Sequence, residues 1–386
     1  MASPPALLTD ARAGPASIER IPMIERNNRV LRIGLIGLGE VAQVVHLPVL
    51  QNLPQLFEVR AACDLSPTLL QVVGDRFAIP RRYSSTRELV ADDDLDAVLV
   101  LNSDEYHAES VIAAVEHGLH VLVEKPMCLS PREADDIIAA RDRTGMTVMV
   151  GYMRRFAPAF TDAKQMLPKL GRVNFARVHD VIGRNQLIID QAVHVERPND
   201  LAAAAIAERA ERGARLVEDA LGPVPAPLGG VYRLLCGLGS HDLSAMRELL
   251  GPPRGVSAAR QWRDGGYIAA LLDYGDFVVA YETGVDEQLR FDAHLEVYGD
   301  TATLRVQYDT PYVRHFPTTL MLEETDGEAY RRSITRPHLK DPYTHELESF
   351  HAAATGGPAA KTTPEDFVAD LDLFVELIRV LEKDAN

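Results

Sequence analysis

Short apolar runs alternate with amphipathic stretches between residues 30 and 151. The runs are nearly continuous in Val, Ile and Leu, which is typical of parallel strands whose two faces are both buried. The stretches between them carry apolar residues at helical spacing, so the pattern predicts alternating strands and helices. The predicted strands are Leu31–Ile36, Val59–Cys63, Ala97–Leu101, His120–Val123 and Thr147–Val150, and the predicted helices are Val41–Gln51, Pro67–Phe77, Tyr106–His117 and Pro131–Thr144.

The pattern changes after Gly151. Strand-like runs there follow one another across tight turns, which favours a mostly antiparallel sheet. Prolines and glycines at 222–230 predict a linker after a helix rich in alanine and charge. The predicted strands are residues 173–181, Gly255–Trp262, Tyr267–Asp273, Phe277–Thr283, Phe291–Tyr298 and Thr301–Gln307, and the predicted helices are Asp200–Ala220, His241–Leu250, His345–Ala354 and Pro364–Lys383.

This change of pattern predicts an α/β protein with two domains. We expect an N-terminal Rossmann domain with a doubly wound parallel sheet over residues 29–151. A C-terminal α+β domain with an open, mostly antiparallel sheet is expected over residues 152–386. Residues 1–28 lack the basic start and the apolar core of a secretory signal, so they are predicted to form a polar, disordered leader.

Composition narrows the class of protein. The 386 residues include 56 acidic residues and 40 Lys or Arg, a formal net charge of −16, whereas nucleic acids and anionic membranes both require basic surface. No apolar run approaches the length of a membrane span. The three cysteines stand far apart, which fits a reducing compartment. We therefore expect a cytoplasmic protein that binds a small molecule, with no nucleic acid and no membrane as partner.

A glycine-rich turn separates the first predicted strand from the first predicted helix. Residues 34–42 read GLIGLGEVA and contain a GxGxxA pattern. Gly37 permits a tight turn, Gly39 lets the backbone approach a pyrophosphate, and Ala42 keeps the helix close to the sheet. The free N–H groups at the start of the helix, at Glu40 and Val41, are donors for the phosphates.

Asp64 ends the second predicted strand. In a dinucleotide-binding unit, an acid at this point accepts hydrogen bonds from a ribose with a free 2′-hydroxyl and repels a 2′-phosphate. We therefore expect NAD as the cofactor, and Ser66 and Arg60 nearby leave NADP as the less favoured alternative. In the plainer interpretation, the glycines form an ordinary turn and Asp64 caps the next helix.

A charged pair ends the strand HVLVEKP at 120–126. Ligands of an open parallel sheet bind beyond the carboxyl ends of its strands, so Glu124 and Lys125 are expected at the cofactor crevice. Lys125 could donate a hydrogen bond to the reacting oxygen of a substrate and stabilise a developing alkoxide. The alternative is an ion pair on the surface.

Four segments together resemble the Gfo/Idh/MocA family, which contains glucose–fructose oxidoreductase and inositol dehydrogenase. They are GLIGLGEVA, the CD at the end of the second strand, AVEHGLHVLVEKP and VGYMRRF. The resemblance covers most of residues 30–156 and the remainder more loosely. It implies an NAD(P)-dependent dehydrogenase or reductase that acts on a sugar, a sugar derivative or a cyclitol, and a homodimer or homotetramer that forms through the C-terminal sheet.

The resemblance also implies roles for residues of the N-terminal domain. Lys125 matches a lysine that contacts both the nicotinamide ribose and the reacting substrate oxygen, and Glu124 matches a glutamate that touches the cofactor. Ser103 and His107 fall in a loop that lies against the cofactor, although Ser103 replaces the usual proline. Arg155 corresponds to an arginine near the substrate mouth.

In the C-terminal domain, the sequence Gly-Ser-His at 239–241 matches the family's GxH element. The resemblance makes His241 the proton acceptor or donor, a role that suits an imidazole. The family commonly has aspartates at the positions held here by Gly237 and Ser244. Their absence removes a polar anchor for a polyhydroxy substrate. Asp242 is interpreted as a helix-capping residue.

Three functions are compatible with these residues. The first is hydride transfer between the nicotinamide and a secondary hydroxyl or its ketone. The second is a redox-neutral elimination or epimerisation that passes through transient oxidation by NAD. The third is a regulatory protein that binds NAD without catalysis, which the missing aspartates favour and which Lys125 and His241 oppose.

The remaining signals are weaker. The histidines show no HExxH motif and no paired spacing, so no metal is expected. Gly183–Gly230 is long for a connection within a domain and is expected to cover the substrate opening. Tyr308, Tyr312, Arg314 and His315 cluster after the last predicted strand, where they could reach the substrate or a partner subunit, and a solvated turn is the favoured interpretation.

Overall fold

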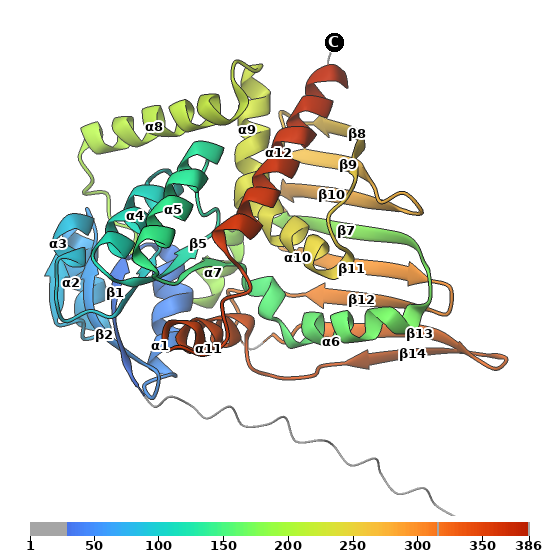
Figure 1. Ribbon diagram of the computed structural model, residues 1–386, viewed down its shortest axis with the longest axis horizontal. Coiled ribbons are helices and arrows are strands. Elements are labelled where there is room, and N and C mark those ends of the chain that lie inside the picture. The colour runs from blue at the N-terminus through green and yellow to red at the C-terminus, as the bar shows by residue number, and fades with distance from the viewer. Residues whose placement is uncertain (1–28, 315, 385–386) are drawn as a thin grey trace, which may run out of the picture.

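Two β-sheets stand side by side in the computed structural model, which describes residues 29–314 and 316–384 (Figure 1). The predicted leader at 1–28 and His315 lie outside the described residues. Residues 31–151 supply a six-stranded parallel sheet, and residues 173–335 supply an eight-stranded, mostly antiparallel sheet. The predicted fold class is therefore confirmed.

All strands of the first sheet run parallel in the order β3-β2-β1-β4-β5-β6. They are β1 Leu31–Ile36, β2 Phe57–Cys63, β3 Arg81–Tyr83, β4 Ala97–Val100, β5 His120–Glu124 and β6 Val148–Gly151. The chain reverses its direction of travel across the sheet between β1 and β4. Ligands of open α/β sheets bind at such a switch point, beyond the carboxyl ends of the strands.

Helices cover both faces of this sheet. They are η1 Ala42–His46, α1 Leu47–Gln51, α2 Pro67–Arg76, α3 Thr86–Val90, η2 Asp104–Tyr106, α4 His107–Glu116, α5 Pro131–Thr144 and, from far along the chain, α11 Pro342–Ala354. Successive strand residues enter opposite cores, since Val100 packs on the side of α4 and α5, and Leu99 packs on the side of α1, α2 and α11. This is why the strands are apolar throughout.

The second sheet has the order β14-β13-β12-β11-β7-β10-β9-β8, and only its β7–β10 pair is parallel within the described residues. Its strands are β7 Val173–Gly183, β8 Gly255–Trp262, β9 Tyr267–Asp273, β10 Val278–Asp286, β11 Phe291–Gly299, β12 Ala302–Tyr308, β13 Thr319–Asp326 and β14 Ala329–Thr335. Helices α6, α10 and α12 lie across one face of it (Figure 1). The helices of this half are η3 Met153–Phe156, α6 Pro158–Met166, η4 Leu167–Leu170, α7 Asn185–Ala192, α8 Ala203–Leu221, α9 Ala226–Leu234, η5 Leu235–Gly239, α10 Ser240–Leu250 and α12 Pro364–Asp384.

The structure corrects two expectations about the second half. Strand β12 is not the last strand, because the hairpin β13–β14 follows it. The predicted linker at 222–230 is partly helical, since α9 begins at Ala226 directly after Pro225, and proline is compatible with the first turn of a helix. No described helix combines the length and the apolar character needed to cross a membrane.

Candidate active site

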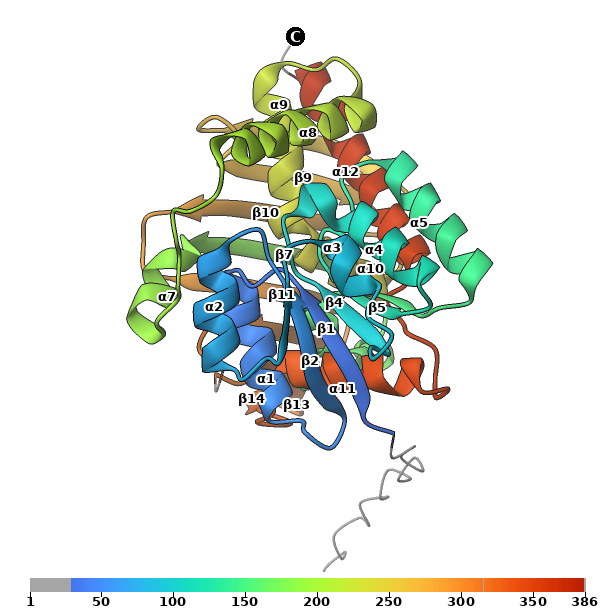
Figure 2. The ribbon, with the colours of Figure 1, turned by 90° about the vertical axis from the view of Figure 1, so that its left-hand side faces the viewer.

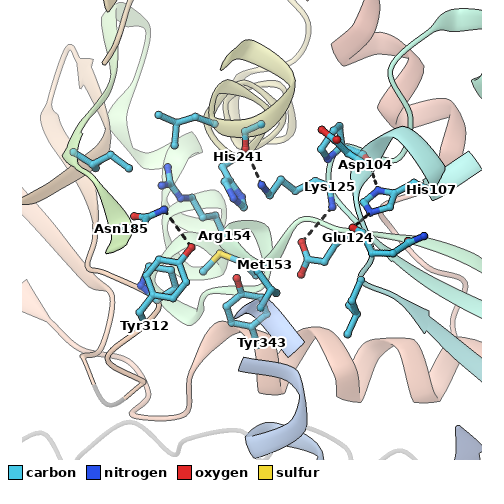
Figure 3. Close-up of a pocket in the computed structure, with 18 of the residues that line it drawn as sticks. Asp104, His107, Glu124, Lys125, Met153, Arg154, Asn185, His241, Tyr312 and Tyr343 are labelled. Atoms are coloured by element: carbon cyan, nitrogen blue, oxygen red, sulfur yellow. Dashed lines mark hydrogen bonds between the residues drawn. The ribbon is translucent and has the colours of Figure 1, made fainter. Parts of the chain in front are cut away.

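A cavity of about 280 Å³ opens where the carboxyl ends of β4 and β5 meet the start of α10 (Figure 3). Both sheet domains contribute to its wall. The lining residues are Val41, Leu101, Asn102, Asp104, His107, Glu124, Lys125, Pro126, Met153, Arg154, Ile182, Asn185, Gly237, Leu238, His241, Phe291, Pro311, Tyr312 and Tyr343. The cavity therefore brings together Lys125 and His241, which the sequence analysis singled out separately.

Lys125 follows β5 and extends across the cavity toward the second domain (Figure 3). Its Nζ donates a hydrogen bond of 2.7 Å to the carbonyl oxygen of Gly237 in η5. Burial lowers the pKa of Lys125, and the nearby carboxylates of Glu124 and Asp104 oppose that shift. The ammonium is thus held in place by one carbonyl and faces the cavity with its other donors.

Glu124 is buried behind Lys125 and pairs with His46. The two side chains are 2.8 Å apart, from Nε2 of His46 to Oε1 of Glu124, and the backbone N–H of Lys125 donates to Oε2 of Glu124 at 3.2 Å. Burial alone would raise the pKa of Glu124, but its bond with His46 and the charge of Lys125 bring that pKa below its usual value. Glu124 is therefore a carboxylate that anchors the end of β5.

His241 lies in the first turn of α10, directly after the π-helical turn η5. Burial lowers the pKa of His241 well below its usual value, and the charges of Lys125 and Arg154 lower it further. Its Nδ1 is buried and has no hydrogen-bond partner among the described residues. His241 is therefore a neutral imidazole that can accept a proton.

Arg154, rather than its neighbour Arg155, lines the cavity. The Arg154 guanidinium is buried between two carboxylates, at 3.0 Å from Asp180 and in a short contact with Asp242. Burial raises the pKa of Asp242 well above its usual value, and Arg154 opposes that shift. Asp242 thus binds a buried guanidinium, in contrast to the capping role expected for it.

Arg155 was expected at the substrate mouth, but it does not line the cavity. Its guanidinium is buried in ion pairs with Glu248 of α10 and Asp366 of α12. The two arginines are consecutive in the helical turn η3, so their side chains leave it in different directions. Arg155 therefore links helices of the second domain, outside the cavity.

His107 is buried at the wall of the cavity, at the start of α4. Its Nδ1 is 2.7 Å from the carbonyl oxygen of Pro126, and its Nε2 is 3.0 Å from that of Asn102. The ring thus ties the end of β4 to the Lys-Pro turn after β5. Ser103 lies on the outer side of this loop, where its Oγ accepts a hydrogen bond of 3.4 Å from Arg209.

A second, larger cavity of about 740 Å³ lies beside the glycine-rich turn, and Gly37, Gly39, Asp64 and Ser103 line it. Gly37 has a φ of 97°, and a Cβ there would lie 2.7 Å from the backbone nitrogen of Asn102, so only glycine fits this turn. At Gly39, no described heavy atom outside its immediate neighbours lies within 4 Å of an ideal Cβ. The backbone is therefore open to an approaching phosphate, and the residues present fit a dinucleotide.

The other members of the glycine motif have different surroundings. Val41 lines the inner cavity and Ala42 is buried under the sheet. The side chain of Glu40 forms an ion pair of 2.6 Å with Arg197. Asp64 accepts hydrogen bonds of 2.8 Å from the backbone N–H groups of Leu38 and Ser66, and its pKa is raised, mainly by burial.

Several residues that line the inner cavity were not predicted. Asn185 donates a hydrogen bond of 3.2 Å to Tyr312, and Tyr343 of α11 also reaches the cavity (Figure 3). The expectation of a solvated turn is wrong for Tyr308 and Tyr312, because Tyr308 is 3% exposed and Tyr312 lines the cavity. Tyr308 is the last residue of β12, and Tyr312 lies in the connection between β12 and β13; their aromatic side chains were the one sequence signal for this burial.

The segment 183–230 was expected to cover the substrate opening, and one part of it lines the larger cavity instead. Leu201, Ala205, Ile206, Glu208 and Arg209 line that cavity, and α8 crosses beside the ends of the parallel strands (Figure 2). Only its first part, at Asn185, reaches the inner cavity. In the described part of the chain, no group of three or more His, Cys, Asp and Glu is arranged to hold a metal ion.

Comparison with known proteins identifies the N-terminal domain. Residues 31–152 match the family described as "Oxidoreductase family, NAD-binding Rossmann fold" of the Gfo/Idh/MocA proteins. The chain is 25% identical to inositol 2-dehydrogenase 2 of Saccharopolyspora erythraea, over 87% of this chain and 88% of that protein. It is 26% identical to myo-inositol 2-dehydrogenase of Thermotoga maritima, over 87% and 92%.

Among solved structures, the fold is similar to that of KijD10, a 3-ketoreductase of Actinomadura kijaniata in complex with TDP-benzene and NADP. The TM-score is 0.66, the identity is 20%, and the match covers 92% of this chain and 97% of that one. This likeness concerns the fold. The family match assigns residues 31–152 to the Gfo/Idh/MocA oxidoreductases, and the two dehydrogenase relatives extend the sequence similarity over 87% of the chain.

Proposed function

We propose that the protein transfers hydride between NAD and a secondary hydroxyl, or the corresponding ketone, of a sugar, a sugar derivative or a cyclitol. The observation that carries this proposal is that Lys125 and His241, from different domains, line one cavity. That cavity adjoins the glycine-lined cavity, since Leu101 and Asn102 line both. A substrate in the inner cavity would therefore lie next to a dinucleotide in the outer one.

In this proposal, two side chains act on the reacting oxygen. Lys125 donates a hydrogen bond to it and stabilises negative charge that develops there during oxidation. His241 takes the hydroxyl proton, which its neutral state permits, and returns it in the reverse direction. When bound, the nicotinamide takes up the hydride or supplies it. Glu124 acts through its contact with Lys125 by fixing the end of β5.

The cofactor proposed is NAD. Its support is the Asp64 carboxylate at the end of β2, beside the glycine-rich turn. Arg60, which with Ser66 left NADP open as the less favoured cofactor, is bound to Asp94 and Glu58 and does not line the cavity. A polyhydroxy substrate is supported by the polar wall around Asn185 and Tyr312, and by the names of the inositol dehydrogenase relatives.

The test is the absorbance of NADH during incubation with NAD and a panel of inositols, aldoses and sugar derivatives. Lys125→Met should lower kcat on the best substrate by about 10²- to 10³-fold, because one charge-stabilising donor is lost. Lys164→Met is the matched control, since Lys164 is an exposed lysine of α6 that pairs with Glu248. Equal turnover by the parent and the Lys125 variant would overturn the role of Lys125.

A redox-neutral reaction is the second candidate. It is supported by the segment that carries Leu201, Ile206 and Arg209 onto the outer cavity, because a covered dinucleotide would leave slowly and could be reoxidised in place. This candidate predicts that NAD remains bound through gel filtration and that product forms without added NAD. Loss of all dinucleotide during purification, with activity strictly dependent on added NAD, would exclude it.

Assembly is proposed to occur through the C-terminal sheet, as a homodimer or homotetramer. The face that α6, α10 and α12 leave uncovered carries exposed Phe175, Trp262 and Tyr298 beside charged residues. The three free cysteines are buried, which supports the cytoplasmic location. Light scattering during gel filtration measures the oligomer, and a monomer at micromolar concentration would contradict the proposal.

A further inference from the structure

Asp200 lies at the N-terminus of α2, although it belongs to the segment between α7 and α8. Its Oδ2 accepts a hydrogen bond of 2.9 Å from the hydroxyl of Ser66 and one of 3.0 Å from the backbone N–H of Thr68. The Ser66 bond and the Thr68 bond lower the pKa of Asp200, so it carries its negative charge at neutral pH. The Asp200 carboxylate thus occupies the position at the start of α2 where the helix could bind an anion from solution.

A second carboxylate lies on the other side of Ser66. Asp64 accepts a hydrogen bond of 2.8 Å from the backbone N–H of Ser66, while Asp200 accepts one from its side chain. The two acids are close enough for the charge of Asp200 to contribute to the raised pKa of Asp64, after burial as the main cause. The residue after Asp200, Leu201, lines the same cavity as Asp64.

The chain before Asp200 is fixed to the N-terminal domain. Gln43 bonds both the backbone N–H and the carbonyl oxygen of Glu196, at 2.9 and 3.1 Å. Arg197 pairs with Glu40 beside the glycine-rich turn. These contacts tie the segment to η1 and to Glu40, two residues before it, so the position of the Asp200 carboxylate is set before any ligand binds.

We propose that Asp200 determines cofactor specificity by excluding a 2′-phosphate from the start of α2. This inference rests on the proposed function, in which Asp64 binds the ribose of NAD. The Ser66 hydroxyl and the Thr68 N–H lie at the start of α2, a few residues after Asp64, and a 2′-phosphate needs such donors for its added charge. Asp200 already accepts hydrogen bonds from the Ser66 and Thr68 donors, and its negative charge, added to that of Asp64, repels the phosphate. A 2′-hydroxyl is uncharged and does not need these donors, so Asp200 disfavours NADP and not NAD.

The test is the dissociation constants of NAD and NADP, measured by calorimetry on the full chain at low and physiological ionic strength. Asp200→Ala should tighten NADP binding on the order of tenfold and change NAD binding less than about threefold. Asp200→Asn should tighten NADP binding less, because its amide still occupies the site. The gain should shrink with added salt, because part of it is electrostatic.

Asp190→Asn is the matched control, since Asp190 is an exposed acid of the preceding helix α7 that pairs with Arg197. It should leave both constants unchanged. If the parent binds NAD and neither Asp200 variant changes the ratio of the two constants, the role of Asp200 is overturned and the proposed function stands. A parent that prefers NADP also overturns it, and a parent that binds neither dinucleotide overturns the proposed function itself.

Discussion

The Nζ of Lys125 donates a 2.7 Å hydrogen bond to the carbonyl oxygen of Gly237, a residue 112 positions further along the chain. The bond joins the two domains across the candidate active site. The resemblance to the Gfo/Idh/MocA family implies an aspartate at the position that Gly237 holds. No described heavy atom outside its helical turn and chain neighbours lies within 4 Å of an ideal Cβ there, so the position can accept a side chain.

Gly237→Asp should therefore fold and should alter the chemistry of the cavity. A carboxylate there lies close to Lys125 and His241, and negative charge raises the pKa of both groups. Because His241 must be neutral to accept the proton, the acidic limb of kcat/KM for alcohol oxidation should move to higher pH. The pH profile of NADH formation measures this shift.

Gly237→Asn is the control for that prediction, because it adds the same volume without charge. It should leave the acidic limb where the parent has it. Thermal unfolding should show both variants within about 1 kcal/mol of the parent, the usual effect of a glycine replacement in a helix. A shift of the limb that is equal in both variants would contradict the electrostatic explanation.

The parent enzyme should keep its oxidation activity in moderately acidic solution. Burial and the charges of Lys125 and Arg154 hold the pKa of His241 well below its usual value. The imidazole is therefore neutral at pH values where a solvated histidine would be protonated. The acidic limb of kcat/KM should lie below pH 6.5, the usual pKa of histidine. A limb above pH 7 would contradict the assignment of His241 as the base.

Arg154 and Arg155 should respond differently to the same substitution. Arg154→Lys changes the wall of the cavity and removes the planar fork that binds Asp180 and Asp242, so KM should rise by about tenfold. Arg155→Lys lies outside the cavity and should leave KM unchanged while lowering the free energy of unfolding by about 1 kcal/mol. Steady-state kinetics with urea unfolding on both variants separates the two effects.

The sequence predicted the parts of this protein that depend on local pattern. The glycine-rich turn and the Lys-Pro turn lie between a strand and a helix, and strand polarity alone puts both at one edge of the sheet. Five of the six N-terminal strands are rich in buried apolar residues and were found within about two residues, whereas the short edge strand β3, Arg81–Tyr83, is polar and was missed. The hairpin β13–β14 was missed because β14 is exposed along its whole length and shows no alternation. Its Asp-Gly turn at 326–327 was the available signal.

The missed parts of the candidate site depend on contacts between distant segments. The choice between Arg154 and Arg155 follows from which carboxylates surround η3, and these come from β7, α10 and α12. Asp200 meets Ser66 across 134 positions, and Tyr312 meets Asn185 across 127. No periodicity within one element encodes such pairs.

Glu346 of α11 is a buried acid near Glu124, and the effect of pH on stability can test whether its pKa is raised. Its side chain is fully buried, and neither carboxylate oxygen has a hydrogen-bond partner among the described residues. Burial raises the pKa of Glu346 well above its usual value, and the charge of Glu124 adds to the shift. In the unfolded chain the group ionises near its usual pKa, so the folded state binds the extra proton and loses stability as the pH rises between the two values.

Glu346→Gln keeps the shape of the protonated acid and cannot ionise. Relative to the parent, it should gain on the order of 1.4 kcal/mol for each pH unit between the usual and the raised pKa. Urea unfolding at pH 5 and pH 8 should therefore show a difference that grows with pH. Glu348→Gln on the same helix is the control, because Glu348 pairs with Lys340 at the surface and should show no such growth. A constant difference between Glu346→Gln and the parent would contradict the raised pKa, because only a proton bound on folding makes the difference depend on pH.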